Sequence, residues 1–323
     1  MPIVVRVVVA PCAFKGTLPA RTVSRVLARA LRRRHFVVDE CPLPDGGEGT
    51  VQALVQLGAA APAGRPIRQA TDGVDVVVED HGAARTLWIE SAAFIGLPVD
   101  RRQRDGSLSS WALGRVVRHH LERHDVDRVV IALGGTGVVD GGAGFLAALG
   151  PRSSRGRGGV SFLGLVDVDA ALCGPRGARL YFAQKGVPYD RFDDVEARLR
   201  ALHPRFVDVK GAGAAGGLGA AILSLGGRLV SGASFVVDAA GLDARVAAAD
   251  VVIGGEGRVD EQTLQGKSLA ALRALATKHK KPLVVVCGRC VVDGFANVVV
   301  ELGDDGITDP VGALTRAARS LAL

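Results

Sequence analysis

The chain opens with short apolar runs that alternate with amphipathic stretches. Val4 to Val9 is rich in β-branched residues and predicts a buried strand, and apolar side chains from Val23 to Leu31 follow at helical spacing. A second strand at Phe36 to Val38 and a helix at Thr50 to Leu57 come next. This alternation of strand, loop and helix is typical of an α/β layered fold.

The middle of the chain, from about residue 62, has a different pattern. Two apolar runs, Val74 to Val78 and Thr86 to Glu90, flank the turn residues of 80–82 and predict an antiparallel hairpin. Residues 151–161 are polar and rich in Gly, Arg and Ser, which indicates a loose segment. The same criteria predict, in chain order, a helix at Ser109 to His124, a strand at Val129 to Leu133, a helix at Asp190 to Leu202, a strand at Arg205 to Val209 and a helix at Ala220 to Leu225.

The last part of the chain returns to alternating elements. We expect, in order, a strand at Ala249 to Ile253, a loop at Gly254 to Gly266, a helix at Leu269 to Lys278, a strand at Leu283 to Val286 and a helix at Pro310 to Leu321. A length of 323 residues is enough for about two domains.

Composition and charge narrow the class of protein. Hydrophobic residues make up 48% of the chain but aromatics only 4%, so Val, Leu, Ala and Ile must build the core, as in parallel sheets. The net charge of +7 comes mainly from Arg. The densest basic run, Arg32 to Arg34, has no interleaved aromatics, so we expect no nucleic-acid partner and instead a small anionic substrate.

Membrane insertion and secretion are not expected. No apolar stretch approaches the ~18 residues that span a bilayer, and Arg6 interrupts the first apolar run, which favours a strand over a signal peptide. Five cysteines, an odd number, indicate a reducing cytoplasm. The CxxC at Cys287 to Cys290 has no second pair, so we interpret it as a strand end followed by a turn.

Glycine-rich segments follow the expected strands at four places: DGGEGT at 45–50, GGTGVVDGGAG at 134–144, GAGAAGGLG at 211–219 and GGEGRVDEQTLQGK at 254–267. Glycine lets backbone N–H groups approach an anion closely, and loops at the carboxyl ends of parallel strands form the ligand crevice of such sheets. Three of these segments carry an acid among the glycines, which favours phosphate and metal binding over simple turns.

Two nucleotide-binding motifs are also considered. Residues 211–216 fit G-x-G-x-x-G, after the expected strand at Arg205 to Val209 and ahead of Asp238, so an NAD(P)-binding oxidoreductase is one alternative. Gly266-Lys267-Ser268 suggests a P-loop, but Glu261 stands where that motif needs glycine. Lys267 could still reach a phosphate as a point charge.

The ordered set of motifs resembles the bacterial glycerate kinase family over nearly the whole chain. The matching segments are APCAFKG at 10–16, Leu43 to Thr50, Trp88 to Leu97 with Glu90 in place, 134–144, 170–178, QKG at 184–186, GAGAAGGLG at 211–219 and GEGRVDEQTLQGK at 255–267. This resemblance implies a kinase that phosphorylates a hydroxyl of glycerate or of a related small hydroxy acid or polyol, with ATP and Mg²⁺. It outweighs the dinucleotide interpretation of 211–219.

The resemblance and the chemistry of phosphoryl transfer together suggest roles for the residues of these loops. Lys15 and Arg258 would neutralise charge, Asp45 or Asp140 would accept the hydroxyl proton, and Glu256 with Asp260 would hold Mg²⁺. The expected phosphate-binding residues are Gly134, Gly135, Thr136, Gly141, Gly142, Gly213, Gly216, Gly217 and Lys267. For each acid, a turn or helix-capping role is the alternative.

The chain also departs from the family pattern. Cys12 and Ala13 stand where the family has Asp and Ser, Val139 replaces an Asn, and Ala170-Ala171 replaces Asn-Pro. Two hypotheses follow: a kinase with a changed acceptor, or a nucleotide-binding paralogue with impaired catalysis.

The expected architecture is two α/β domains with a cleft between them. One is Rossmann-like and discontinuous, from residues 1–61 and about 245–323, and the other is an insertion of about 62–244. A cytoplasmic enzyme is expected, with a homodimer as the assembly considered.

Overall fold

The computed structural model describes residues 4–57, 67–71, 74–80, 84–150, 159–261, 263 and 268–322. The chain divides into two compact units. Unit 1 comprises Met1–Asp45, Gln52–Ala59 and Ala233–Leu323, and unit 2 comprises Gly46–Val51 and Ala60–Gly232. Residues 233–244 therefore group with unit 1, ahead of the boundary expected near residue 245, and residues 46–51 group with unit 2.

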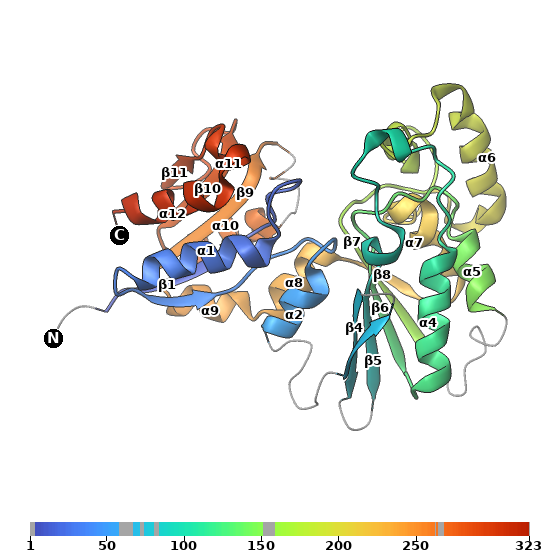
Figure 1. The fold of residues 1–323 in the computed structure, drawn as a ribbon, viewed down its shortest axis with the longest axis horizontal. Coiled ribbons are helices and arrows are strands. Elements are labelled where there is room, and N and C mark those ends of the chain that lie inside the picture. Colours follow the sequence, from blue (N-terminus) through green and yellow to red (C-terminus); the bar gives the residue numbers. More distant parts are fainter. Residues whose placement is uncertain are drawn as a thin grey trace. The chain divides into compact units, whose positions relative to one another are not determined.

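Unit 1 is built on a five-stranded sheet with the order β11-β10-β9-β1-β2 (Figure 1). All its strand pairs are parallel, and the central pair aligns Val7 with Val251. Counted along this unit alone, the order is 2-1-3-4-5, the doubly wound arrangement of a Rossmann-like fold. Its strands and helices are β1 (Arg6–Pro11), α1 (Ala20–Arg32), β2 (Val37–Glu40), α9 (Leu242–Ala248), β9 (Val251–Val259), α10 (Ser268–Lys278), β10 (Leu283–Cys290), β11 (Val298–Glu301), α11 (Asp305–Thr308) and α12 (Pro310–Ser320). Two more, α2 (Thr50–Gln56) and α8 (Gly232–Ala239), contain the unit boundaries.

Helices cover both faces of this sheet because its strands carry apolar residues at successive positions. Val7, Val9 and Ile253 pack with the apolar stripes of α1 and α12 on one face. The other face meets α9 and α10. There a Cβ on Gly254 would lie 2.6 Å from Leu269 Cδ1, so a larger residue would require the leucine side chains of α10 to shift.

Unit 2 contains a six-stranded sheet with the order β3-β4-β5-β6-β7-β8. Strands β5 to β8 are parallel, and β3 and β4 add an antiparallel edge. Its strands and helices are β3 (Ile67–Thr71), β4 (Val74–Asp80), β5 (Arg85–Glu90), α3 (Ala92–Ile95), α4 (Trp111–Arg123), β6 (Arg128–Ala132), α5 (Ala143–Leu149), β7 (Ser161–Val166), α6 (Phe192–Leu202), α7 (Ala214–Ser224) and β8 (Arg228–Ser231), with short 3-10 turns η1 (Arg101–Gln103), η2 (Ala178–Tyr181), η3 (Ala183–Lys185), η4 (Tyr189–Arg191) and η5 (Pro204–Phe206).

The core of unit 2 joins this sheet to three helices. Leu113, Phe145 and Leu218 from α4, α5 and α7 pack against Ile89 and Ile131 of the strands. The expected α/β fold class, with parallel strands covered by helices, is therefore confirmed.

Several expected elements differ from those observed. Arg205 to Val209 lies in the 3-10 turn Pro204–Phe206 and the turn that follows it, so no strand directly precedes the glycines of 211–216. Asp238 lies inside α8 and not at the end of a strand. Because both features of a dinucleotide-binding motif are missing, the NAD(P) interpretation of 211–219 is wrong.

Two further corrections concern the strands of unit 1. β9 continues through the glycines to Val259, where a loop from Gly254 was expected. β10 continues to Cys290, so the CxxC is part of a strand and not a turn. Cys287 and Cys290 are three positions apart and face opposite sides of the sheet, and burial raises the pKa of Cys287 to about 12.

In the part of the chain that the structure describes, no helix is long and apolar enough to cross a membrane.

Candidate active site

The carboxyl ends of β1 and β9 mark the switch point of the unit 1 sheet, where the strand order reverses direction. Ligands of doubly wound sheets bind at this point, outside the carboxyl ends of the strands. The loop after β1 carries Lys15, the loop after β2 carries Asp45, and the end of β9 carries Glu256, Arg258 and Asp260. Five of the predicted site residues thus lie along one edge of one sheet.

Lys15 and Asp45 form an ion pair, with 3.4 Å between Nζ and Oδ2. The lysine side chain is 67% exposed and the aspartate side chain 25% exposed. Ser268 Oγ, at the start of α10, donates to Pro44 O and fixes the chain just before Asp45. Exposed ion pairs add little stability, so exchanging this pair for another partner costs little free energy.

Thr263 organises the acids at the end of β9. Its buried hydroxyl donates to Glu256 Oε2 at 3.0 Å and accepts from the backbone N–H of Asp260 at 3.2 Å. Arg258 Nε lies 3.5 Å from Asp260 Oδ2. Thr263 was missed as a functional residue from the sequence, although its position within the matched 255–267 motif was a signal for it.

A glycine brings the loop after β1 close to β9. A Cβ on Gly257 would lie 3.3 Å from Phe14 Cα and 3.5 Å from Lys15 N. These distances leave little space for a side chain, so glycine allows Lys15 to lie at the same edge as the β9 acids.

The acids at this edge fit Mg²⁺ better than a metal held by protein ligands alone. The described residues contain no group of three or more His, Cys, Asp or Glu that could hold a metal ion. Mg²⁺ usually binds through one or two carboxylates, with waters and substrate phosphates completing its shell. Asp260 has a partly open carboxylate, whereas Glu256 is 9% exposed and has one oxygen engaged by Thr263.

In unit 2, Asp140 stabilises the glycine loop 134–144. Its carboxylate accepts hydrogen bonds from Ser110 N and Oγ, both at 2.8 Å, and from the N–H groups of Gly142 and Gly144. A loop-stabilising role explains this acid without a substrate. A role in accepting a proton stays a prediction.

The glycines of 211–217 allow two backbones to pack together. A Cβ on Gly216 would lie 1.9 Å from Val138 O, and one on Gly213 would lie 2.1 Å from Ala171 O. Gly141 N donates to Gly216 O at 3.0 Å, which joins the two loops. These contacts are within the chain, and phosphate binding by Gly141, Gly142, Gly213, Gly216 and Gly217 stays a prediction.

The segment 46–51 lies against the start of the 134–144 loop. Gly134 N donates to Gly46 O at 3.1 Å, and a Cβ on Gly134 would lie 2.6 Å from Gly47 Cα. Glu90, the last residue of β5, accepts from Gly49 N and Val51 N, both at 2.9 Å. Glu90 thereby fixes this segment through two charge-assisted hydrogen bonds. Gly135 has a positive φ of 78° in the same loop, and Lys267 lies outside the described residues.

Lys185 was not among the predicted site residues, although it belongs to the matched QKG segment. Its side chain is almost fully buried, and Nζ donates to Val138 O at 3.0 Å and lies 3.5 Å from Thr136 Oγ1. Burial lowers the pKa of Lys185 to about 8, although the carboxylates of Asp167 and Asp140 raise it. The Lys185 ammonium group therefore contacts the hydroxyl of Thr136, which is itself only 5% exposed.

The lowered pKa of Lys185 gives stability a defined pH dependence. The unfolded lysine keeps its ordinary pKa of 10.5, whereas the folded one loses its proton near pH 8. Between these values the unfolded state holds the extra proton, so raising the pH favours folding. Relative to Lys185→Met, we expect the wild type to gain on the order of 1–2 kcal/mol of unfolding free energy from pH 8 to pH 10.

Urea unfolding at pH 7.5, 9 and 10 measures this difference. Lys210→Met, which removes an 85% exposed lysine of the same unit, serves as the control. If Lys185→Met and Lys210→Met show the same pH dependence, the lowered pKa is wrong.

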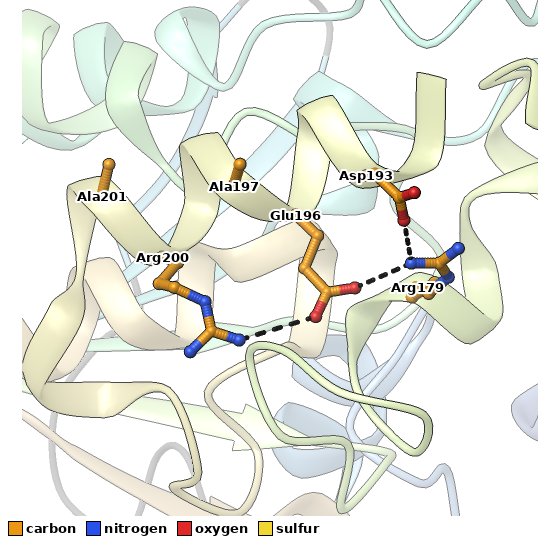
Figure 2. Close-up of a pocket in the computed structure, with 6 residues that line it drawn as sticks. All are labelled: Arg179, Asp193, Glu196, Ala197, Arg200 and Ala201. Atoms are coloured by element: carbon orange, nitrogen blue, oxygen red, sulfur yellow. Dashed lines mark hydrogen bonds and ion pairs between the residues drawn. The ribbon is translucent and has the colours of Figure 1, made fainter. Parts of the chain in front are cut away.

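A surface cavity of about 390 Å³ lies along α6 of unit 2 (Figure 2). Figure 2 shows Arg179 beside Asp193 and Glu196, and Glu196 also pairs with Arg200 at 3.8 Å. The two positive charges are balanced by two carboxylates, and none of the lining residues was a predicted site residue. This cavity therefore offers no net charge for an anionic substrate.

Comparisons with known proteins test the family resemblance. The model of the glycerate kinase family matches residues 7–159 and 153–318. The chain is 33% identical to the glycerate kinase of Bacillus subtilis, over 94% of this chain and 89% of that protein. It is 29% identical to the glycerate 2-kinase of Escherichia coli, over 98% of this chain and 97% of that one.

A solved structure is also similar. The crystal structure of a glycerate kinase 2 from Salmonella typhimurium LT2 superposes with a TM-score of 0.73 at 30% identity, and the match covers 98% of this chain and 97% of that chain. These matches confirm the resemblance inferred from the motifs. The chain belongs to the glycerate kinase family and is a kinase, a phosphotransferase with an alcohol group as acceptor.

Proposed function

We propose that the chain transfers the terminal phosphoryl group of ATP, with Mg²⁺, to a hydroxyl of glycerate or of a related small hydroxy acid or polyol. The observation that carries this proposal is the row of charged residues at the switch point of unit 1: Lys15, Asp45, Glu256, Arg258 and Asp260. Phosphoryl transfer depends almost entirely on positioning and on neutralising the phosphate oxygens, and this row supplies charges of both signs.

Each residue has a role consistent with its surroundings. Lys15 and Arg258, 67% and 62% exposed, would contact anionic oxygens of the substrates. Asp260 would hold Mg²⁺. The Thr263 hydroxyl, itself bound to Glu256, would fix the position of Asp260 by accepting a hydrogen bond from its backbone N–H. Mg²⁺ would supply neutralisation of the phosphate oxygens during transfer. Asp45 would accept the proton of the acceptor hydroxyl. Its ion pair with Lys15 would orient the Asp45 carboxylate.

Isothermal titration with ATP and with NADPH, each with Mg²⁺, tests the nucleotide. We expect ATP to bind and NADPH to give no heat of binding, because the dinucleotide motif is absent. Tight binding of NADPH without ATP would contradict the proposal.

The acceptor is tested by ATP consumption over a panel of hydroxy acids and polyols, with ³¹P NMR of the product. We expect one new phosphomonoester signal. ATP binding without turnover on any acceptor would instead favour the nucleotide-binding paralogue with impaired catalysis. Cys12 and Ala13, which replace the Asp and Ser of the family pattern, are consistent with that alternative.

A further inference from the structure

Arg258 and Arg289 are direct neighbours on two adjacent parallel strands. The register of β9 and β10 pairs Cys287 with Glu256 and Arg289 with Arg258. Paired residues of adjacent strands point to the same face, and neighbouring strands are about 4.8 Å apart. Both arginines are exposed, so two positive side chains stand side by side at the carboxyl ends of these strands.

This pairing is unfavourable unless something negative lies against it, because like charges on neighbouring strands repel. Asp260 lies 3.5 Å from Arg258. Among the described residues, no carboxylate forms an ion pair with Arg289 within 4.0 Å. Two other acids of this face are engaged: Glu256 accepts from Thr263, and Glu301 accepts from the backbone N–H of Cys290 at 2.8 Å.

The position of Arg289 also suits a ligand. β10 lies beside β9 in the sheet, and β9 lies beside β1, so Lys15, Arg258 and Arg289 occur at the ends of three adjacent strands. Lys15 and Arg258 each have a carboxylate nearby, from Asp45 and Asp260 respectively. Arg289 adds one further positive charge at the edge where we place the substrates.

We propose that Arg289 acts with Arg258 to bind an oxyanion group of a substrate, either a phosphate of the donor or the carboxylate of a hydroxy-acid acceptor. The planar guanidinium matches both groups with two parallel hydrogen bonds. This inference rests on the proposed function, because it assigns one more binding residue to the same site.

Kinetics of Arg289→Gln and Arg289→Lys distinguish the two sources of the oxyanion. A hydrogen bond to a charged group contributes enough that its loss should raise the affected KM about 10- to 100-fold. If the KM for ATP rises, the group is a phosphate. If the KM rises for hydroxy acids but not for uncharged polyols, it is the acceptor carboxylate.

Arg289→Lys keeps the positive charge but loses the two parallel hydrogen bonds of the guanidinium, so we expect a smaller rise in the same KM than with Arg289→Gln. Arg6→Gln is the matched control, since Arg6 is an exposed arginine at the opposite end of β1 in the same sheet. We expect its KM values to match those of the wild type. Unchanged KM values for all substrates in Arg289→Gln would overturn the proposal.

A thermal-shift assay tests the same site without turnover. Inorganic phosphate and D-glycerate are titrated into wild type, Arg289→Gln and Arg6→Gln. We expect at least one of the two anions to raise the melting temperature of the wild type and of Arg6→Gln more than that of Arg289→Gln. Equal shifts for both anions in all three proteins would overturn the proposal. If the wild type neither binds ATP nor turns over, the proposed function fails, and the thermal shifts still decide the role of Arg289.

Discussion

Replacing Asp260 by asparagine is expected to lower the rate of phosphoryl transfer by roughly 10²- to 10³-fold, the scale observed when a preorganised charge-stabilising group is removed. Asparagine keeps the shape of the side chain but cannot supply the negative charge that holds Mg²⁺. The local fold should persist, because Thr263 binds the backbone N–H of residue 260 and not its carboxylate. The measurement is kcat for the best acceptor together with a melting curve.

Asp243→Asn is the control for a lost carboxylate in unit 1. Asp243 is 55% exposed and pairs with Lys278 on the surface, so we expect its kcat to remain that of the wild type. Asp260→Asn with unchanged turnover and unchanged melting would remove Asp260 from the site.

Glycerate is expected to be a poor acceptor, and changing Cys12 to Asp together with Ala13 to Ser should raise its kcat/KM. Cys12 follows β1 directly, donates its N–H to Gly255 O at 2.7 Å and is 8% exposed at the switch point. Neither a thiol nor a methyl group replaces the hydrogen bonds of a carboxylate and a hydroxyl. Sites that lose such partners discriminate by up to ~10⁴-fold in well-built cases, which sets the upper limit of the gain.

The KM for ATP is the internal control, and we expect the double variant to change it little. Glycerate phosphorylated by the wild type with the efficiency of an ordinary kinase would show that Cys12 and Ala13 are neutral substitutions. A double variant with no gain, but normal melting, would assign the choice of acceptor to other residues.

The sequence predicted the regular parts of the fold best. The β-branched runs of β1, β6 and β10 and the apolar stripes of α1 and α4 were located correctly, because their burial is continuous along the chain. β7 was missed because Gly164 interrupts its apolar run. A Cβ there would lie 2.6 Å from Leu229 Cδ2 of β8, so the glycine makes room for this side chain, a tertiary contact that no local pattern shows.

The opposite error occurred at residues 205–209 and at β9. Arg205 to Val209 alternates like a strand, but Pro204 begins a 3-10 turn there. The glycines of 254–257 suggest a loop, yet pairing with β1 and β10 keeps them in a strand. At β9 tertiary pairing overrides the local preference, whereas at 205–209 the local signal of Pro204 was overlooked.

The candidate site was inferred from charged residues, and the residues that were overlooked are those whose place depends on the fold. Asp45, Arg258 and Asp260 stood out as charges in glycine-rich segments, and Lys15 as the charge of the matched segment 10–16. Thr263 has no charge, and Lys185 is buried behind the loop that it supports. Arg289 is identified only by its register opposite Arg258, and a register between strands cannot be read from spacing along the chain.

Unit 2 is inserted between β2 and β9, so residues that pair in the unit 1 sheet are synthesised at different times. Val7 of β1 pairs with Val251 of β9, so β1 cannot complete its pairing in the unit 1 sheet until the ribosome has added the whole of unit 2. At 5–20 residues per second this delay is about 10 to 50 s. Unit 2 is continuous apart from residues 46–51 and emerges complete before β9. During synthesis, β1 therefore has only β2 as a partner within its sheet, and the valine-rich strand keeps one unpaired edge that must be protected from other chains.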